Sequence, residues 1–111
     1  MKLPNIEQAE VAEAKLVDYL LNPLHPIGRT KAAFFMAFGF SPASWKIMRN
    51  AFIEHALQYD VTEIAPMTDG IHYLIEGALQ CPDNRIPVVR VVWRIDKGMV
   101  KPRFITAYPG E

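Results

Sequence analysis

The chain has 111 residues, of which 50% are hydrophobic and 22% are charged. This composition is typical of one folded globular domain and is too apolar for a disordered chain. Twelve basic residues balance twelve acidic ones, so no overall field draws the protein onto nucleic acid or anionic lipid. The single cysteine, Cys81, excludes an internal disulfide framework and a cysteine-rich metal site.

The beginning of the chain is polar and acidic, without the apolar core of a signal peptide. Its longest apolar stretch, residues 32–40, is far shorter than the roughly 20 residues that a membrane span requires. We therefore expect a cytoplasmic protein with no membrane segment, folded as a single domain over residues 1–111.

The spacing of apolar residues divides this domain into a helical part, about residues 10–58, and a sheet part, about residues 61–108. Helices are expected from about residue 10 or 12 to 21, over 31–38 and over 42–58, with Thr30 and Ser41 as N-caps and Gly39 after the second helix. Strands are expected over residues 61–66, 71–79, 87–95 and 102–108. Short connections make neighbouring strands antiparallel. The predicted fold is α+β, with three N-terminal helices packed on one face of a four-stranded antiparallel meander.

Strand alternation assigns faces to the sheet residues. The expected core includes Trp45, Phe52, Val89, Val91, Trp93 and Ile95. A hairpin closing symmetrically about Asp83 pairs Glu76 with Arg90, and His72 with Arg94, on the open face. Such pairs are common on solvated sheets, where each contributes about 0.2–1 kcal/mol. The same four residues also offer the base, acid and cations that metal-free RNA cleavage requires.

The loop before the second helix gathers three basic or titratable side chains, His25, Arg29 and Lys31, at a helix N-terminus. Free backbone N–H groups and the helix dipole favour anions there, so one interpretation is a phosphate or carboxylate pocket that includes Thr30. Gly28 allows either a close backbone approach or a positive φ. The other interpretation is a shaped turn in which His25 binds backbone and Lys31 is solvated.

The remaining titratable candidates are weaker. His55 lies in the third helix near aromatic residues and is expected to be structural, and Cys81 has no histidine partner that would activate it. The three histidines lack metal-ligand spacing. We therefore expect no metal and no cofactor.

Residues 15–35 fit the pattern K-L-x-x-Y-L-L-x-P-x-H-P-x-G-x-x-K-A-x-F-F, and residues 102–109, near the end of the chain, read P-R-F-I-T-A-Y-P. Together with the start Leu3-Pro4-Asn5, these motifs resemble a family of small bacterial domains of unknown function. The resemblance covers nearly the whole chain.

More distantly, helices followed by a four-stranded antiparallel sheet resemble the barnase–EndoU–colicin–RelE group of RNA-cleaving toxins, whose last strand often ends in Thr-x-Tyr/Phe-Pro. This resemblance implies a site of His25, Arg29, Lys31 and Thr106, with Arg90 or Arg94 as accessory cations. It also implies RNA as substrate and a cognate immunity or antitoxin protein as partner.

Two functional hypotheses follow. The first is a metal-independent, toxin-related endoribonuclease with catalytic His25, Lys31, Thr106 and Arg90. Its anion- or RNA-binding residues would be Arg29, Thr30, Arg94, His72 and Glu76. The second is a non-catalytic protein-interaction module that uses the same surface, with Glu76 neutralising Arg90 and no pocket at the loop. The first predicts that His25, Lys31 and Thr106 converge with Arg90 or Arg94 on one cleft.

Overall fold

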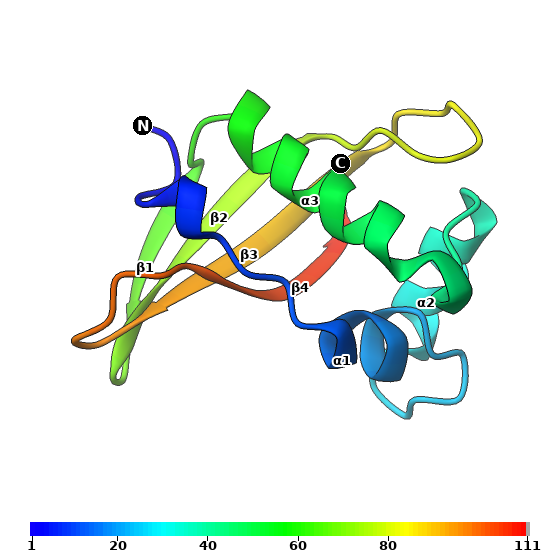
Figure 1. The fold of residues 1–111 in the computed structure, drawn as a ribbon, viewed down its shortest axis with the longest axis horizontal. Coiled ribbons are helices and arrows are strands. Elements are labelled where there is room, and N and C mark those ends of the chain that lie inside the picture. Colours follow the sequence, from blue (N-terminus) through cyan, green and yellow to red (C-terminus); the bar gives the residue numbers. More distant parts are fainter. Residues whose placement is uncertain (111) are drawn as a thin grey trace.

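The computed structural model describes residues 1–110 and contains short helical segments followed by one sheet (Figure 1). The helical segments are η1 Ile6–Gln8, α1 Glu13–Lys15, η2 Leu16–Leu20, α2 Arg29–Ala37, η3 Pro42–Ser44 and α3 Trp45–Gln58. The strands are β1 Glu63–Met67, β2 Gly70–Ala78, β3 Val88–Asp96 and β4 Arg103–Pro109. The strand order β1-β2-β3-β4, antiparallel throughout, confirms the predicted α+β meander.

The β2–β3 hairpin has the register expected from the sequence, pairing Glu76 with Arg90 and His72 with Arg94. Val89, Val91 and Trp93 are fully buried, so the predicted faces of β3 are correct. Their neighbours Arg90, Val92 and Arg94 lie on the opposite side, which we call the outer face.

A β-bulge in β4 determines which of its side chains reach the outer face. Val92 pairs with Thr106 while the next residue, Trp93, pairs with Phe104, so Ile105 is the extra residue. Phe104 is therefore buried in the core, whereas Thr106 and Tyr108 lie on the outer face opposite Val92 and Arg90. Strict alternation would have placed Phe104 and Thr106 on the same face.

The first predicted helix is instead one α-turn, α1, followed by the π-helical turn η2. The Leu21 N–H donates to the Leu16 carbonyl over 2.7 Å, a bond that spans five residues rather than four. Leu16, Leu20 and Leu21 are all fully buried. The wider turn places all three of these leucines in the core.

The helix starts also differ from prediction. Helix α2 begins at Arg29 with Gly28 as its N-cap, so Thr30 lies in the first turn and is not the cap. Gly39, with a φ of 100°, follows α2 as expected. Ser41 makes no capping hydrogen bond, and the 3-10 turn η3 precedes α3.

The core lies between the sheet and α3, which crosses the sheet in Figure 1, with α1 and α2 grouped beside the beginning of α3. Phe52 on α3 stacks on Phe104 of β4. Trp45 and Ile95 are only partly buried, so their predicted full burial is wrong. Cations of Lys46 and Arg49 lie over the Trp45 ring at the start of α3.

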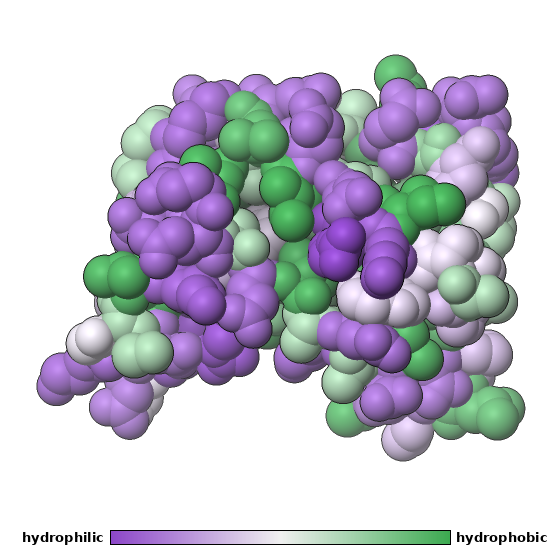
Figure 2. Space-filling view, in the orientation of Figure 1, coloured by the Kyte–Doolittle hydropathy of each residue, from purple (hydrophilic) through white to green (hydrophobic). Residues whose placement is uncertain are grey.

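The surface of Figure 2 carries a strip of hydrophobic side chains between hydrophilic ones. No described helix is both long and apolar enough to cross a membrane.

His55 is buried on α3, with 2% of its surface exposed, and its Nε2 lies 3.1 Å from the Gly77 carbonyl oxygen. Burial lowers the pKa of this imidazole below 6.5 and outweighs the opposing effect of the Gly77 and Val89 backbone. The structural role expected from the sequence agrees with this burial.

We expect the free energy of unfolding to decrease as the pH falls below about 6.5, because His55 then binds a proton in the unfolded chain more readily than in the folded protein. Denaturant unfolding at several pH values measures this slope. His55→Gln retains an N–H donor for the Gly77 carbonyl and does not titrate, so its stability should change less between pH 7.5 and pH 5. Equal slopes for the two proteins would contradict the assignment.

Candidate functional site

Three polar side chains from distant parts of the chain meet where α2 lies beside β4. The Lys31 ammonium on α2 donates hydrogen bonds to the Tyr19 hydroxyl over 2.7 Å and to the Thr106 hydroxyl over 3.1 Å. The Tyr19 and Thr106 oxygens are themselves 3.0 Å apart. We call Tyr19, Lys31 and Thr106 the Lys31 cluster. All three side chains are half-buried, so the cluster is held firmly and is still reached by solvent.

The structure therefore brings together two of the predicted site residues, Lys31 and Thr106, which are 75 positions apart. The β4 bulge turns Thr106 to the outer face, and the first turn of α2 carries Lys31 toward it. Lys31 is consequently a bound side chain, in contrast to the solvated lysine of the shaped-turn interpretation.

Tyr19 is the member that sequence analysis missed. It lies in the π-helical turn η2, and such turns often occur at functional sites. A Cβ atom added to Gly28 would lie 2.7 Å from the Tyr19 carbonyl oxygen and 2.8 Å from its ring. With a φ of −84°, Gly28 is thus required for close approach and not for a positive φ.

His25 lies beside the cluster, with its ring centroid 5.2 Å from that of Tyr19 in an edge-on arrangement. Its Nδ1 accepts hydrogen bonds from the backbone N–H groups of Ile27 and Gly28, at 3.1 and 3.0 Å. The imidazole therefore occupies N–H groups that the anion-pocket interpretation left for a ligand. For His25, the shaped-turn interpretation is correct.

Two opposing effects set the acidity of Tyr19. Burial alone would raise the pKa of its phenol. Hydrogen bonds from Lys31 and Thr106, together with the positive charges of Lys31 and Lys15, outweigh this effect and lower the pKa below 10. Proximity to cations thus favours the phenolate.

A row of side chains on the outer face extends the site across the sheet. Tyr108 pairs with Arg90, and Arg90 pairs with Glu76. The Lys31 ammonium lies 6.0 Å from the centre of the Tyr108 ring. Arg90 Nε lies 3.3 Å from a Glu76 carboxylate oxygen, so this predicted cation is already bound to an acid.

His72 and Arg94 form a separate group on the same face. Arg94 Nη1 lies 3.3 Å from His72 Nε2, and Arg94 Nε donates to Asp96 over 2.7 Å. Asp96 also accepts from Arg103, and the two guanidinium groups hold the pKa of the Asp96 carboxyl well below its usual range. These residues form an ion-pair network away from the Lys31 cluster. Arg29 and Thr30, in the first turn of α2, are both exposed.

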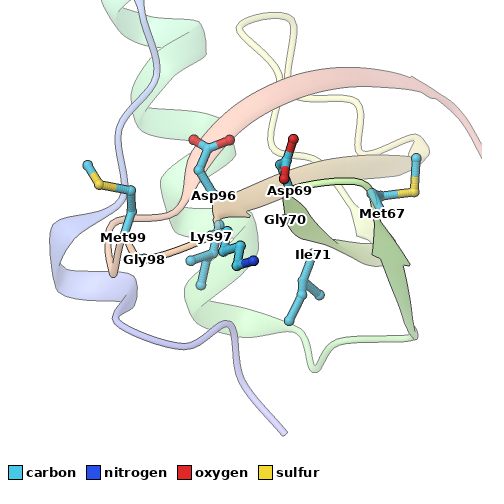
Figure 3. A pocket seen from close by; sticks show the side chains of 9 residues that line it. Met67, Asp69, Gly70, Ile71, Asp96, Lys97, Gly98 and Met99 are labelled. Carbon is cyan, nitrogen blue, oxygen red and sulfur yellow. The ribbon is translucent and has the colours of Figure 1, made fainter.

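Two cavities of the described residues lie away from the Lys31 cluster, and none of its three residues lines either of them. A cavity of about 440 Å³ lies at the hairpin ends, with Met67 and Met99 on opposite sides (Figure 3). A smaller one of about 120 Å³ lies on the outer face and includes Glu63, His72 and Val92. Within the described residues, no three His, Cys, Asp or Glu side chains are placed to hold a metal ion. The Cys81 thiol is buried, and burial raises its pKa to about 11, which suits an unreactive side chain.

The sequence did contain a signal for the tyrosines that the structure adds. Tyr19 is the tyrosine of the K-L-x-x-Y-L-L motif, and Tyr108 is the tyrosine of the Thr-x-Tyr-Pro motif that begins at Thr106. Both motifs therefore contribute to one surface.

No curated protein and no solved structure has significant similarity to this chain. The family model of DUF6883, a domain of unknown function, matches residues 2–111. This match confirms the expectation of a family of small domains whose function is not known. The chain belongs to the DUF6883 family.

Proposed function

We propose that this domain is a metal-independent endoribonuclease that cleaves RNA phosphodiesters at the Lys31 cluster. The observation that carries the proposal is the ammonium of Lys31, bound to two hydroxyl groups on a partly exposed surface. Lys31 and Thr106 are also two of the four residues that the resemblance to RNA-cleaving toxins implied, the others being His25 and Arg29. An enzyme of this kind would act in the cytoplasm, where an immunity or antitoxin protein could cover the same face.

The chemistry of RNA cleavage matches this set of groups. Attack of the 2′-oxygen on phosphorus concentrates negative charge on the phosphoryl oxygens, which a fixed ammonium stabilises. Lys31 supplies that charge directly. Arg90 supplies a second cation, beyond the Tyr108 ring in the same row of the outer face. Hydroxyl groups of Thr106 and Tyr19 can orient the substrate by hydrogen bonds.

The test is cleavage of single-stranded RNA by the purified chain in the presence of EDTA. We expect cleavage by the parent protein and a loss of about 100-fold or more in Lys31→Ala, because electrostatic stabilisation of the transition state is removed. Lys46→Ala is the matched control, since Lys46 is an exposed lysine on α3. Circular dichroism establishes that each variant is folded. An inactive parent, or equal rates for parent and Lys31→Ala, would contradict the proposal.

A second candidate, a non-catalytic protein-interaction module, is favoured by the Glu76–Arg90 ion pair. A carboxylate 3.3 Å from the guanidinium offsets the charge that would attract a phosphate. A folded parent protein that neither binds nor cleaves RNA would support this candidate.

A further inference from the structure

We infer that Tyr19, as its phenolate, accepts the 2′-hydroxyl proton in the cleavage step, and that His25 is a positioning residue. The inference rests on the proposed function. The two side chains differ in their hydrogen bonds: those of His25 occupy the nitrogen that could accept a proton, whereas those of Tyr19 come from groups that stabilise a phenolate.

His25 has no nitrogen with which to take a proton from a substrate. Its Nδ1 lone pair faces the N–H groups of Ile27 and Gly28. In the neutral ring the other nitrogen, Nε2, must carry the hydrogen. The ring therefore fixes the loop that leads into α2 and packs edge-on against Tyr19.

Tyr19 has the opposite properties. Its oxygen lies 2.7 Å from the Lys31 ammonium and 3.0 Å from the Thr106 hydroxyl, and both neighbours can donate hydrogen bonds to a phenolate. Lys15 on α1 adds a positive charge 5.9 Å from the ring centre. The groups that face the phenol from α1, α2 and β4 are thus two ammonium groups and a hydroxyl, which together lower the pKa of Tyr19.

The step that this arrangement supports is a transesterification. The 2′-oxygen loses its proton to the Tyr19 phenolate and forms a bond to phosphorus. The bond from phosphorus to the 5′-oxygen breaks, and the leaving oxygen takes a proton from water. The products are a 2′,3′-cyclic phosphate and a 5′-hydroxyl. As Tyr19 becomes neutral, the Lys31 charge that had balanced the phenolate becomes available to the phosphoryl oxygens.

The ionisation of Tyr19 can be measured without RNA. Ultraviolet absorbance of tyrosinate during an alkaline titration should show one tyrosine that ionises at lower pH than the others. Tyr19→Phe should abolish this early transition, and Lys31→Ala should move it to higher pH. Tyr59→Phe, which removes a different half-buried tyrosine, should retain it. An early transition that persists in Tyr19→Phe would overturn the inference.

The roles of the two residues are separated by matched variants in RNA cleavage. Tyr19→Phe keeps the ring against Gly28 and lacks the oxygen, so we expect a loss of about 100-fold or more. His25→Asn keeps a side-chain acceptor for the loop N–H groups, in the way that Asn22 Oδ1 accepts from the Leu24 N–H. This variant should therefore retain most of the activity and the same pH profile.

Failure of this inference is distinguishable from failure of the proposed function. Cleavage by Tyr19→Phe at the parental rate, or complete loss in a folded His25→Asn, would overturn the assigned roles and leave the ribonuclease proposal standing. An inactive parent would overturn both.

Discussion

Replacing Phe52 by alanine should lower the free energy of unfolding by about 3–5 kcal/mol, the usual result of emptying a buried aromatic position. Phe52 is fully buried on α3. Its ring stacks on that of Phe104 of β4, with the ring centroids 4.8 Å apart, and contacts the Phe35 ring of α2 edge-on, with the centroids 6.0 Å apart. One side chain therefore joins α3 to the sheet and to the helix that carries Lys31.

Denaturant unfolding measures this effect, with Leu57→Ala as the control on the same helix. Leu57 is 49% exposed, so its truncation removes less buried surface and should cost far less. Because small domains are commonly stable by about 5–15 kcal/mol, Phe52→Ala leaves a marginal fold. Similar losses for the two variants would show that Phe52 does not hold the layers together.

The sheet was predictable because its signals are local. The alternation in β3 distinguishes Val91 and Trp93 from Arg90 and Arg94, and closing the hairpin symmetrically about Asp83 gives the pairing of β3 with β2. Burial of Trp93 and the Glu76–Arg90 pairing followed from these signals. The predicted full burial of Ile95 was wrong, because alternation gives the face on which a residue lies but not how far the helical layer covers the strand.

The candidate site was predictable only in part, because its geometry depends on irregular backbone. Lys31 and Thr106 were connected by the resemblance to toxins and not by any periodicity. The bulge at Ile105 and the π-helical turn around Tyr19 depend on tertiary packing, for which no single residue is a signal. Capping of the α2 loop by His25 was one of two open interpretations.

Gly28→Ala is the variant that tests whether this irregular backbone supports the Lys31 cluster. At a helical φ of −84°, alanine would by itself stabilise the protein by about 0.4–1 kcal/mol, through the unfolded chain. The added Cβ would instead lie 2.7 Å from the Tyr19 carbonyl oxygen, a backbone atom that cannot rotate away. Overpacking of this kind costs about 1–3 kcal/mol. The clash prevails, and we expect a net loss of about 1–2 kcal/mol.

To relieve this clash the Tyr19 backbone must move away from residue 28. That movement should separate the Tyr19 hydroxyl from the Lys31 ammonium, because their 2.7 Å hydrogen bond leaves little room for movement. Gly28→Ala should therefore lose stability and also shift the early tyrosinate transition to higher pH. Arg29→Ala, at the next and exposed position, should change stability by no more than about 0.5 kcal/mol and leave the transition in place. If Gly28→Ala is as stable as the parent and the transition does not move, then the backbone of η2 shifts at little cost in free energy. The position of the Tyr19 hydroxyl would then depend on Lys31 of α2 and not on the contact with Gly28. A loss of stability without the shift would mean that the Lys31 cluster follows Tyr19 when its backbone moves.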